Sequence, residues 1–216
     1  MTTKTAVKPS TGIDTVKSET SSISLNRIKR STCHIEIVGT APLIVHAWSP
    51  KAKLMMLNAQ QGKKTPKTPK DPIADYFDSM YRFENDEHGF PTLGFKAATV
   101  SGGARVFGRT VRMTEMRIAM SFIADGVSTQ GDQLTVLHAS EPRMREDMVR
   151  IGMGTADLRY RAEYEEWGAT LTIKYLPNMI DVDSIVALVD AGGLNGVGEW
   201  RPEKDGICGT YEVVGA

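Results

Sequence analysis

The stretch from Gly192 to Tyr211, GGLNGVGEWRPEKDGICGTY, constrains the fold more than any other part of this chain. Its glycines are Gly192, Gly193, Gly196, Gly198, Gly206 and Gly209. Glycine lacks a Cβ, so it adopts positive φ and lets another backbone or a phosphate come close. A helix end at the first two glycines leaves the later four unexplained. The pattern therefore predicts a close-approach loop before a final strand, with Trp200, Arg201 and Lys204 beside the glycines.

Residues 1–31 differ in composition from the rest of the chain. They are rich in Thr, Ser and Lys and almost free of large apolar side chains. Such a segment cannot bury enough apolar surface to offset the entropy lost on ordering. We therefore expect a disordered or partner-ordered basic arm over 1–31 and a single domain over 32–216. The basic residues of the arm could contact nucleic acid, and a solubilising tail explains them equally well.

The balance of charge limits long-range attraction. Lys and Arg number 26, and so do Asp and Glu, which gives a formal net charge of zero. No global field therefore attracts nucleic acid or a membrane, and any binding of anions must be local. The charges are uneven, however, and the densest basic run holds Arg105, Arg109, Arg112 and Arg117. On a strand-like extension these arginines would line one face, whereas a solvated surface is the competing interpretation.

The sequence contains no signal for a metal, a cofactor or export. Cys33 and Cys208 give neither a disulfide framework nor a metal spacing, which indicates reduced thiols in a cytoplasmic protein. The N-terminus lacks the apolar core of a secretory signal, and no apolar run is long enough to cross a bilayer. The histidines are scattered, and no Walker loop, GxSxG or HExxH motif occurs. We expect no metal and no cofactor.

The hydrophobic periodicity predicts an α+β fold. Strands are expected at 33–39, 117–124, 133–138, 169–175 and 209–214, and helices at 50–61, 73–83, 95–106 and 182–191. Gly102-Gly103 predicts close packing of the third helix or its early end. Without insertions at about 49–89 and 126–168, the order is strand, helix, strand, strand, helix, strand. That order is the ferredoxin-like (RRM-like, split βαβ) pattern.

Three short motifs now carry a resemblance to a known family. Their sequences are IVGTAPL at 37–43, FPTLGFKAA at 90–98 and GVGEWR at 196–201. In this order they resemble the opening strand and turn, the middle lysine motif and the C-terminal glycine loop of the RAMP superfamily. The resemblance runs from about Cys33 to the C-terminus. It is greatest to the filament-forming backbone subunits of CRISPR effector ribonucleoproteins, and extends to a free-standing or phage-borne relative.

The resemblance implies a function in binding single-stranded nucleic acid. Backbone subunits coat a guide RNA, with the helix that corresponds to Lys96 lying along the strand. A thumb-like β-hairpin separates bases, and residues 140–168 are its candidate here. The expected residues near its tip are Arg143, Met144, Arg145, Met148 and Arg150. A mobile surface loop is the alternative interpretation of this segment.

The sequence therefore predicts a non-enzymatic protein whose partners are single-stranded RNA or ssDNA, copies of itself in a head-to-tail filament and other effector subunits, but no membrane. The expected nucleic-acid contacts are Lys51, Lys53, Lys96, Ser101, Arg105, Arg109, Arg112, Arg143, Met144, Arg145, Arg159, Arg161, Trp200, Arg201 and Lys204, together with the loop glycines Gly196, Gly198, Gly206 and Gly209.

Other functions stay open at this point. His46 follows the first strand and would serve as general acid or base in a metal-independent endoribonuclease, although a buried, hydrogen-bonded histidine explains it too. Asp71 and Asp75 are loop aspartates of the kind that some target-cutting subunits use. A third alternative is a structural or inhibitory protein that mimics an effector subunit. Antiviral interference, recombination and replication all suit a strand-binding protein.

Overall fold

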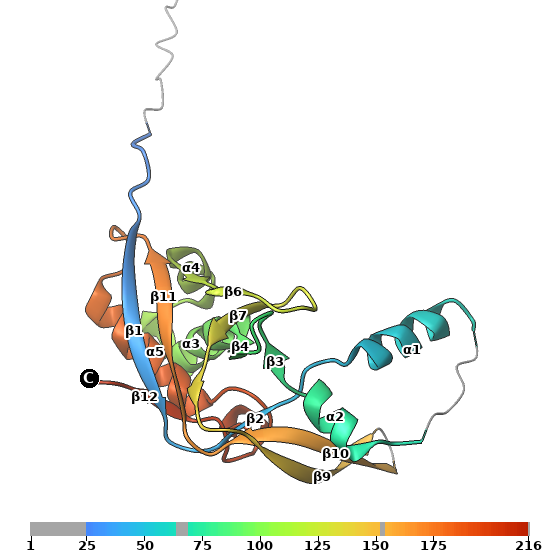
Figure 1. Ribbon diagram of the computed structural model, residues 1–216. Coiled ribbons are helices and arrows are strands. Elements are labelled where there is room, and N and C mark those ends of the chain that lie inside the picture. The colour runs from blue at the N-terminus through green and yellow to red at the C-terminus, as the bar shows by residue number, and fades with distance from the viewer. Residues whose placement is uncertain (1–24, 64–68, 152–153, 216) are drawn as a thin grey trace, which may run out of the picture.

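The computed structural model describes residues 25–63, 69–151 and 154–215. Most of the predicted arm lies outside these residues. The predicted single domain over 32–216 stays a prediction. Over the described part the fold combines antiparallel sheets with α-helices, as expected for the α+β class (Figure 1).

The largest sheet holds the strands expected to form the core. In sheet order they are β12 (Tyr211–Val213), β1 (Ser31–Gly39), β11 (Trp167–Tyr175) and β5 (Met120–Ile123), all antiparallel, and β8 (His138–Ala139) also pairs with β11. Side chains alternate along β1, where Ile35 and Ile37 are buried and Glu36 is exposed. One face of the sheet is therefore core and the other is solvated.

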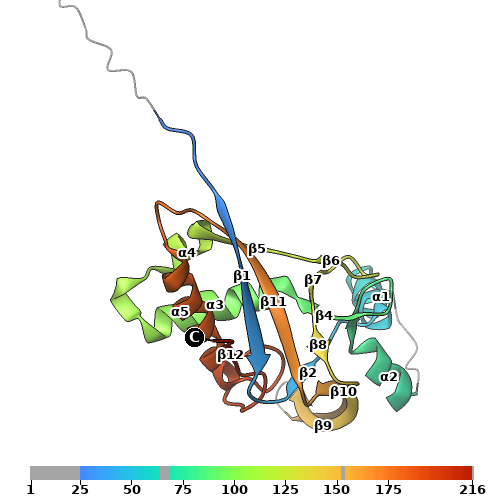
Figure 2. The ribbon, with the colours of Figure 1, turned by 60° about the vertical axis from the view of Figure 1, so that its left-hand side comes forward.

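Two helices cover the buried face of this sheet, α3 (Thr92–Val106) and α5 (Val182–Asn195) (Figure 2). They approach closely because both carry glycine at their contact. A Cβ on Gly102 would lie against the Ala191 carbonyl, and one on Gly192 would lie 2.8 Å from the Thr99 nitrogen. The predicted close packing at Gly102 is confirmed. The predicted end of the last helix at Gly192 is wrong, because that glycine lies within α5.

A second sheet forms an extended hairpin at the bottom of Figure 1. Its order is β2 (Leu43–Val45), β10 (Thr155–Tyr164) and β9 (Arg143–Ile151). The segment 140–168 was expected to be a thumb-like hairpin or a mobile surface loop. Its base belongs to the core, because Ala162 and Tyr164 are completely buried. Burial raises the pKa of the Tyr164 hydroxyl, which is hydrogen-bonded to His88 Nδ1 at 2.8 Å.

The remaining elements form a third sheet and two outlying helices. The sheet order is β3 (Tyr81–Arg82), β4 (His88–Pro91), β7 (Gln133–Val136) and β6 (Gly126–Val127). The outlying helices are α1 (Pro50–Gln60) and α2 (Pro72–Asp78). The start of α1 is as predicted, with the Ser49 hydroxyl accepting from the Ala52 nitrogen at 3.1 Å. The second helix, expected to reach 83, ends at Asp78.

Two further predictions of local structure fail. The third helix begins at Thr92 rather than at 95, directly after Pro91, which ends β4 and occupies the N-cap position. The strand expected over 117–124 is half helix. Residues 108–110 form a short 3-10 helix, α4 spans Met113–Ala119, and β5 begins only at Met120.

Candidate functional site

An ion-pair network occupies the base of the β9–β10 hairpin. The antiparallel register places Arg143 opposite Glu163 and Arg145 opposite Arg161, all on one face. Arg143 Nε lies 2.7 Å from Glu163 Oε2, and Arg145 Nη1 lies 2.9 Å from Glu163 Oε1. Asp147 on the same face receives Arg145 Nε at 2.9 Å and Arg161 Nη1 at 3.1 Å. Three arginines and two carboxylates therefore form one cluster.

Most of this cluster, which we call the base network, is withdrawn from water. The side chains of Arg161, Glu163 and Asp147 are only 3, 4 and 7% exposed. Burial works to raise the pKa of the Asp147 carboxyl, but hydrogen bonds from Arg145, Trp200 and Arg161 outweigh it and hold that pKa below its usual value. Removing one partner would leave a buried charge uncompensated. Arg145 and Arg161, expected to contact phosphates, are thus held by carboxylates of the protein.

The glycine-rich loop packs against the same network. Trp200 Nε1 donates to Asp147 Oδ2 at 3.2 Å, and Arg161 Nη2 lies 3.6 Å from Glu199 Oε2. A Cβ on Gly198, whose φ is +75°, would lie 2.5 Å from the Ile44 carbonyl oxygen. A Cβ on Gly209, whose φ is +69°, would overlap the Val197 carbonyl. The predicted close approach exists, but its partner is the backbone of this chain.

The remaining loop glycines follow the same rule. A Cβ on Gly206 would overlap the Trp200 carbonyl, and one on Gly196, the C-cap of α5, would lie 2.8 Å from Pro202 Cδ. These glycines were expected to contact nucleic acid, and in this structure it is the chain itself that approaches them closely. They fold the loop tightly against the hairpin and β2.

The outer half of the hairpin has the opposite character. Met148 and Leu158 lie directly opposite each other, and they are 73 and 42% exposed. Met144 shares their face and is 49% exposed, while Arg150 is exposed on the next position toward the tip. Arg143, Met144 and Arg145 were expected near the tip. The register places them at the base, because the strands separate only after Ile151 and Thr155.

A cleft of about 500 Å³ lies between β10, α2 and the segment after β2. Its basic side chains are Lys70 and Arg159, and its acidic ones are Asp75, Asp78, Asp157 and Glu199. Lys70 Nζ lies 2.5 Å from Asp157 Oδ1, and Arg159 Nε lies 3.6 Å from Asp157 Oδ2. The carboxylates outnumber the cations, so an anion bound in this cleft must contact Lys70 or Arg159 locally, against the net charge of the cleft.

His46 lies in this cleft and also lines a smaller one of about 250 Å³ beside the glycine loop. Arg159 Nη1 donates to His46 Nε2 at 3.4 Å, which places the proton of the neutral ring on Nδ1. Burial, together with the positive charges of Arg161 and Arg159, lowers the pKa of His46. At neutral pH the ring is therefore a neutral base.

The residues predicted on α3 do not share a face. Lys96 Nζ donates to the Arg117 carbonyl at 3.2 Å, whereas Arg105 pairs with Glu203 at 3.3 Å and donates to Asn195. Nine helical residues separate the two, which turns one about 180° from the other. Lys96 and Arg105, both expected to contact nucleic acid, therefore lie on opposite sides of the helix. Ser101 accepts from Asn195 Nδ2 at 2.7 Å and belongs with Arg105.

The other predicted basic residues are dispersed. Arg105 lies in the last turn of α3, Arg109 in the 3-10 helix and Arg112 at the N-cap of α4, so the strand-like arginine face is not formed. Arg112 pairs with Glu115 at 3.5 Å on the surface. Lys53 on α1 donates to Gln130 at 2.7 Å, and Lys51 on the same helix is exposed.

Loop residues account for the rest of the predicted set. Arg201 pairs with Glu203 at 2.9 Å, and Lys204 is exposed in the 3-10 helix 202–204. Asp71 is the N-cap of α2, accepting from the nitrogens of Ile73 and Ala74 at 3.1 Å.

The carboxylates and the amide that hold these cations were not predicted from the sequence. They are Asp147, Glu163, Glu199, Asn195 and Glu203. Leu158, the partner of Met148, was not predicted either. Alternation along the two hairpin strands does put Asp147 and Glu163 on the arginine face, but only the register reveals the pairing.

Among residues 25–63, 69–151 and 154–215 no cluster of His, Cys, Asp or Glu could hold a metal ion. No helix in the described part of the chain is long and apolar enough to cross a membrane. Burial raises the pKa of both free thiols, Cys33 and Cys208.

Comparison with known proteins gives distant likenesses only. No protein family model and no curated protein matches the chain. Among solved structures, a chain from the cryo-EM structure of the Type III-B Cmr-beta bound to cognate target RNA aligns with a TM-score of 0.48 and 9% identity, over 86% of this chain and 59% of that one. The crystal structure of Cmr6 from Pyrococcus furiosus aligns with a TM-score of 0.42 and 8% identity, over 87% of this chain and 100% of that one. This chain thus spans 59% of the first of these proteins.

Proposed function

We propose that this protein is a RAMP-like subunit that binds single-stranded nucleic acid without catalysing a reaction, using the outer half of the β9–β10 hairpin as a thumb. The observation that carries the proposal is the exposed pair Met148–Leu158, flanked by Arg150. An apolar pair beside a cation can separate two stacked bases while the cation contacts the adjacent phosphate.

The base network supports this function mechanically. A hairpin that holds two bases apart must resist bending. Buried ion pairs between β9 and β10, tied to the glycine loop through Trp200, brace the hairpin where it leaves the core. On this view Arg143, Arg145 and Arg161, which were expected to bind phosphates, instead stabilise the hairpin through their ion pairs. Arg150 and the dispersed surface cations would contact the nucleic acid.

The topology supports a ferredoxin-like assignment of the core. If β1, β5, β11 and β12 are numbered as the first to fourth core strands, the sheet order is 4-1-3-2. Helix α3 lies between the first two strands in sequence and α5 between the last two. This is the arrangement of a split βαβ fold, into which the hairpin and the third sheet are inserted.

The proposed partners follow from the surface chemistry. The net charge is zero, and the exposed cations do not gather on one face of the protein. Contacts with the nucleic-acid backbone should therefore be few and local, with little sequence preference. RNA and single-stranded DNA both suit such a surface. Copies of the same chain and other effector subunits would extend the binding surface along the nucleic-acid strand. The assembly would be a cytoplasmic ribonucleoprotein that serves CRISPR-type interference or recombination.

Equilibrium binding tests the proposal. Nuclease-treated full-length protein is titrated into fluorescently labelled single-stranded RNA and DNA of mixed sequence, and anisotropy is followed at several salt concentrations. The expected result is saturable binding to both strands or to one of them, weakening as salt rises. Protein that leaves both probes free at low ionic strength contradicts the proposal.

One observation favours a second function, that of a metal-independent endoribonuclease. The neutral His46 ring lies where two clefts meet, beside Arg159 and within a cleft that also contains Asp75. A neutral imidazole can remove a proton from a ribose hydroxyl once that hydroxyl replaces Arg159 at Nε2, and the released guanidinium can then face the phosphate. Incubation with labelled RNA in chelator tests it. Cleavage that His46→Ala abolishes supports the nuclease, and intact RNA rejects it.

A further inference from the structure

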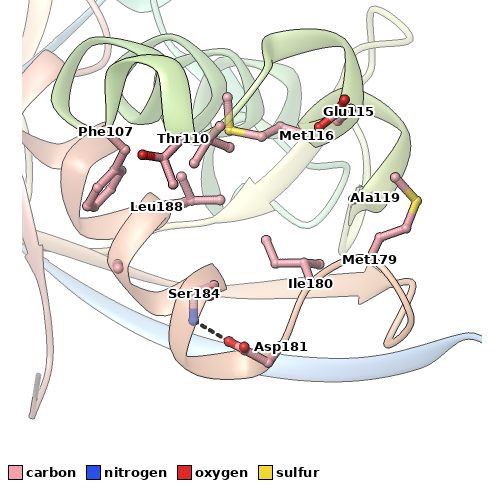
Figure 3. A pocket seen from close by; sticks show the side chains of 12 residues that line it. Phe107, Thr110, Glu115, Met116, Ala119, Met179, Ile180, Asp181, Ser184 and Leu188 are labelled. Carbon is pink, nitrogen blue, oxygen red and sulfur yellow. Dashed lines mark hydrogen bonds between the residues drawn. The ribbon is translucent and has the colours of Figure 1, made fainter.

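An apolar groove lies between α4, the chain around 107–111 and the start of α5 (Figure 3). Its volume is about 430 Å³. The apolar side chains that line it include Phe107, Met116, Ala119, Met179, Ile180 and Leu188. Phe107 and Met179 at its lips are 37 and 46% exposed. The proposed thumb lies on a different sheet, so the nucleic-acid role does not use this groove.

The charges that line the groove are acidic. They are Glu115 from α4 and Asp181 at the start of α5, and no lysine or arginine of the described chain lines it. Asp181 caps α5 by accepting from the Ser184 nitrogen at 2.7 Å. Glu115 pairs only with the exposed Arg112, and such surface pairs contribute little. The groove therefore suits a segment that is apolar and basic at once.

Residues 25–30, LNRIKR, are such a segment. They precede β1 without regular secondary structure, and every one of them is exposed. Leu25 and Ile28 are 85 and 66% exposed, and the residues between and after them are basic or polar. In Figures 1 and 2 the segment continues in line with β1 and leaves the body of the molecule. Two large apolar side chains with three cations are thus presented to solvent.

We propose that residues 25–30 of a second copy of this chain occupy the groove, with Leu25 and Ile28 inserted between its apolar walls and the arm cations facing Glu115 and Asp181. The interaction is independent of nucleic acid. It is a contact separate from any assembly along a nucleic acid, and it can hold or fail without the proposed function.

The position of the arm favours reciprocal exchange between two copies. Ser31, where the arm joins β1, lies opposite Tyr175 at the end of β11. After β11 the chain turns within a few residues, with the Met179 nitrogen donating to the Leu176 carbonyl at 2.9 Å. Met179 and the residues that follow it then line the groove. Arm and groove therefore lie at the same end of the molecule. Two copies related by a twofold axis can each insert an arm into the other.

Sedimentation velocity of the nuclease-treated, full-length protein tests the proposal over a wide range of concentration. The wild type should form a concentration-dependent dimer. Leu25→Asp with Ile28→Asp, on exposed positions that cannot disturb the core, should weaken the dimer by roughly a hundredfold or more. Met179→Glu at the groove lip should do the same. The matched control, Leu54→Asp with Leu57→Asp on the exposed helix α1, should leave the dimer intact.

Mixing the variants distinguishes exchange from an arm that folds onto its own groove. The arm variant retains a groove, and the groove variant retains an arm, so a labelled mixture should form a heterodimer that neither variant forms alone. A further pair, Arg27→Glu in one copy and Glu115→Lys in the other, should recover association lost by Arg27→Glu. A wild type that stays monomeric, a dimer that survives the arm substitutions, or one that only the α1 control dissolves overturns the proposal.

Discussion

Trp200 Nε1 donates a 3.2 Å hydrogen bond to the Asp147 carboxylate and so joins the glycine-rich loop to the base of the hairpin. Trp200 has a φ of +53°, a conformation uncommon for residues other than glycine. The surrounding structure must hold it there, because the strained backbone would otherwise relax. Loop and hairpin are therefore one mechanical unit, and the buried carboxylate is its centre.

Asp147→Asn should destabilise the protein by about 3–5 kcal/mol at neutral pH, because it leaves Arg145 and the buried Arg161 without their shared counter-charge. Urea unfolding followed by far-UV circular dichroism measures the change. Glu146→Gln, on the adjacent exposed position, is the matched control and should change stability by less than about 0.5 kcal/mol. Equal effects of the two substitutions would show that the network does not brace the hairpin.

The same carboxylate should make stability depend on acid pH. The pKa of Asp147 is lowered in the folded state from an ordinary value of 3.8. Its contribution is therefore complete above that value and is lost as the pH falls through the lower folded pKa. The difference in unfolding free energy between wild type and Asp147→Asn should narrow below pH 3.8. A difference that stays constant from neutral to acid pH contradicts the pairing.

Two glycines with positive φ offer a test of the loop packing. Gly209→Ala should cost clearly more than Gly131→Ala, although the φ angles, +69° and +91°, are both unfavourable for alanine. Gly131 has open space beside it, so only the backbone cost of about 1–2 kcal/mol applies. At Gly209 the new methyl overlaps the Val197 carbonyl and adds about 1–3 kcal/mol. Similar melting temperatures for the two variants would mean that the loop is loosely packed.

The sequence predicted the core of this fold because its signals are local. Alternation along 33–39 and 169–175 specifies which side of each strand faces the core, and both strands form as expected. Ser49 before Pro50 likewise specifies the start of α1. Such patterns need no knowledge of distant residues.

The failures occurred where tertiary contacts decide. Residues 117–119 alternate like a strand, yet Met116 and Ala119 are three apart and also fit the buried side of a helix, which is what forms. Gly192 was predicted to end the last helix, but α5 continues to Asn195. The glycine instead allows the close contact with Thr99 of α3. The arginines at 145 and 161 resembled a nucleic-acid surface, and only the strand register shows that carboxylates meet them.

His46 should titrate below its ordinary pKa of 6.5, because burial and two neighbouring guanidiniums disfavour its charged form. Since the unfolded chain then binds the proton more readily, stability should fall as the pH drops through 6.5. An NMR titration of the ring protons, assigned by their loss in His46→Gln, measures the midpoint. A midpoint at or above 6.5 would contradict the contact with Arg159.

The charge of Arg150 near the hairpin tip should influence how the affinity for single-stranded nucleic acid depends on salt. Arg150→Glu should weaken binding to any sequence and reduce the slope of log affinity against log salt by about 0.7 or more. Lys174→Glu is the control, because Lys174 is an exposed cation on β11, in a different sheet from the hairpin. If the two substitutions lower the slope equally, the contact is diffuse and the hairpin has no special role.

The wedge itself is tested most directly by replacing Met148 and Leu158 with serine and measuring anisotropy against single-stranded RNA and DNA. The control carries Val38→Ser and Ile123→Ser, which remove exposed apolar side chains from strands β1 and β5 of the largest sheet. The account predicts that the hairpin variant loses at least about tenfold in affinity while the control binds like the wild type. Full affinity in the hairpin variant would contradict it.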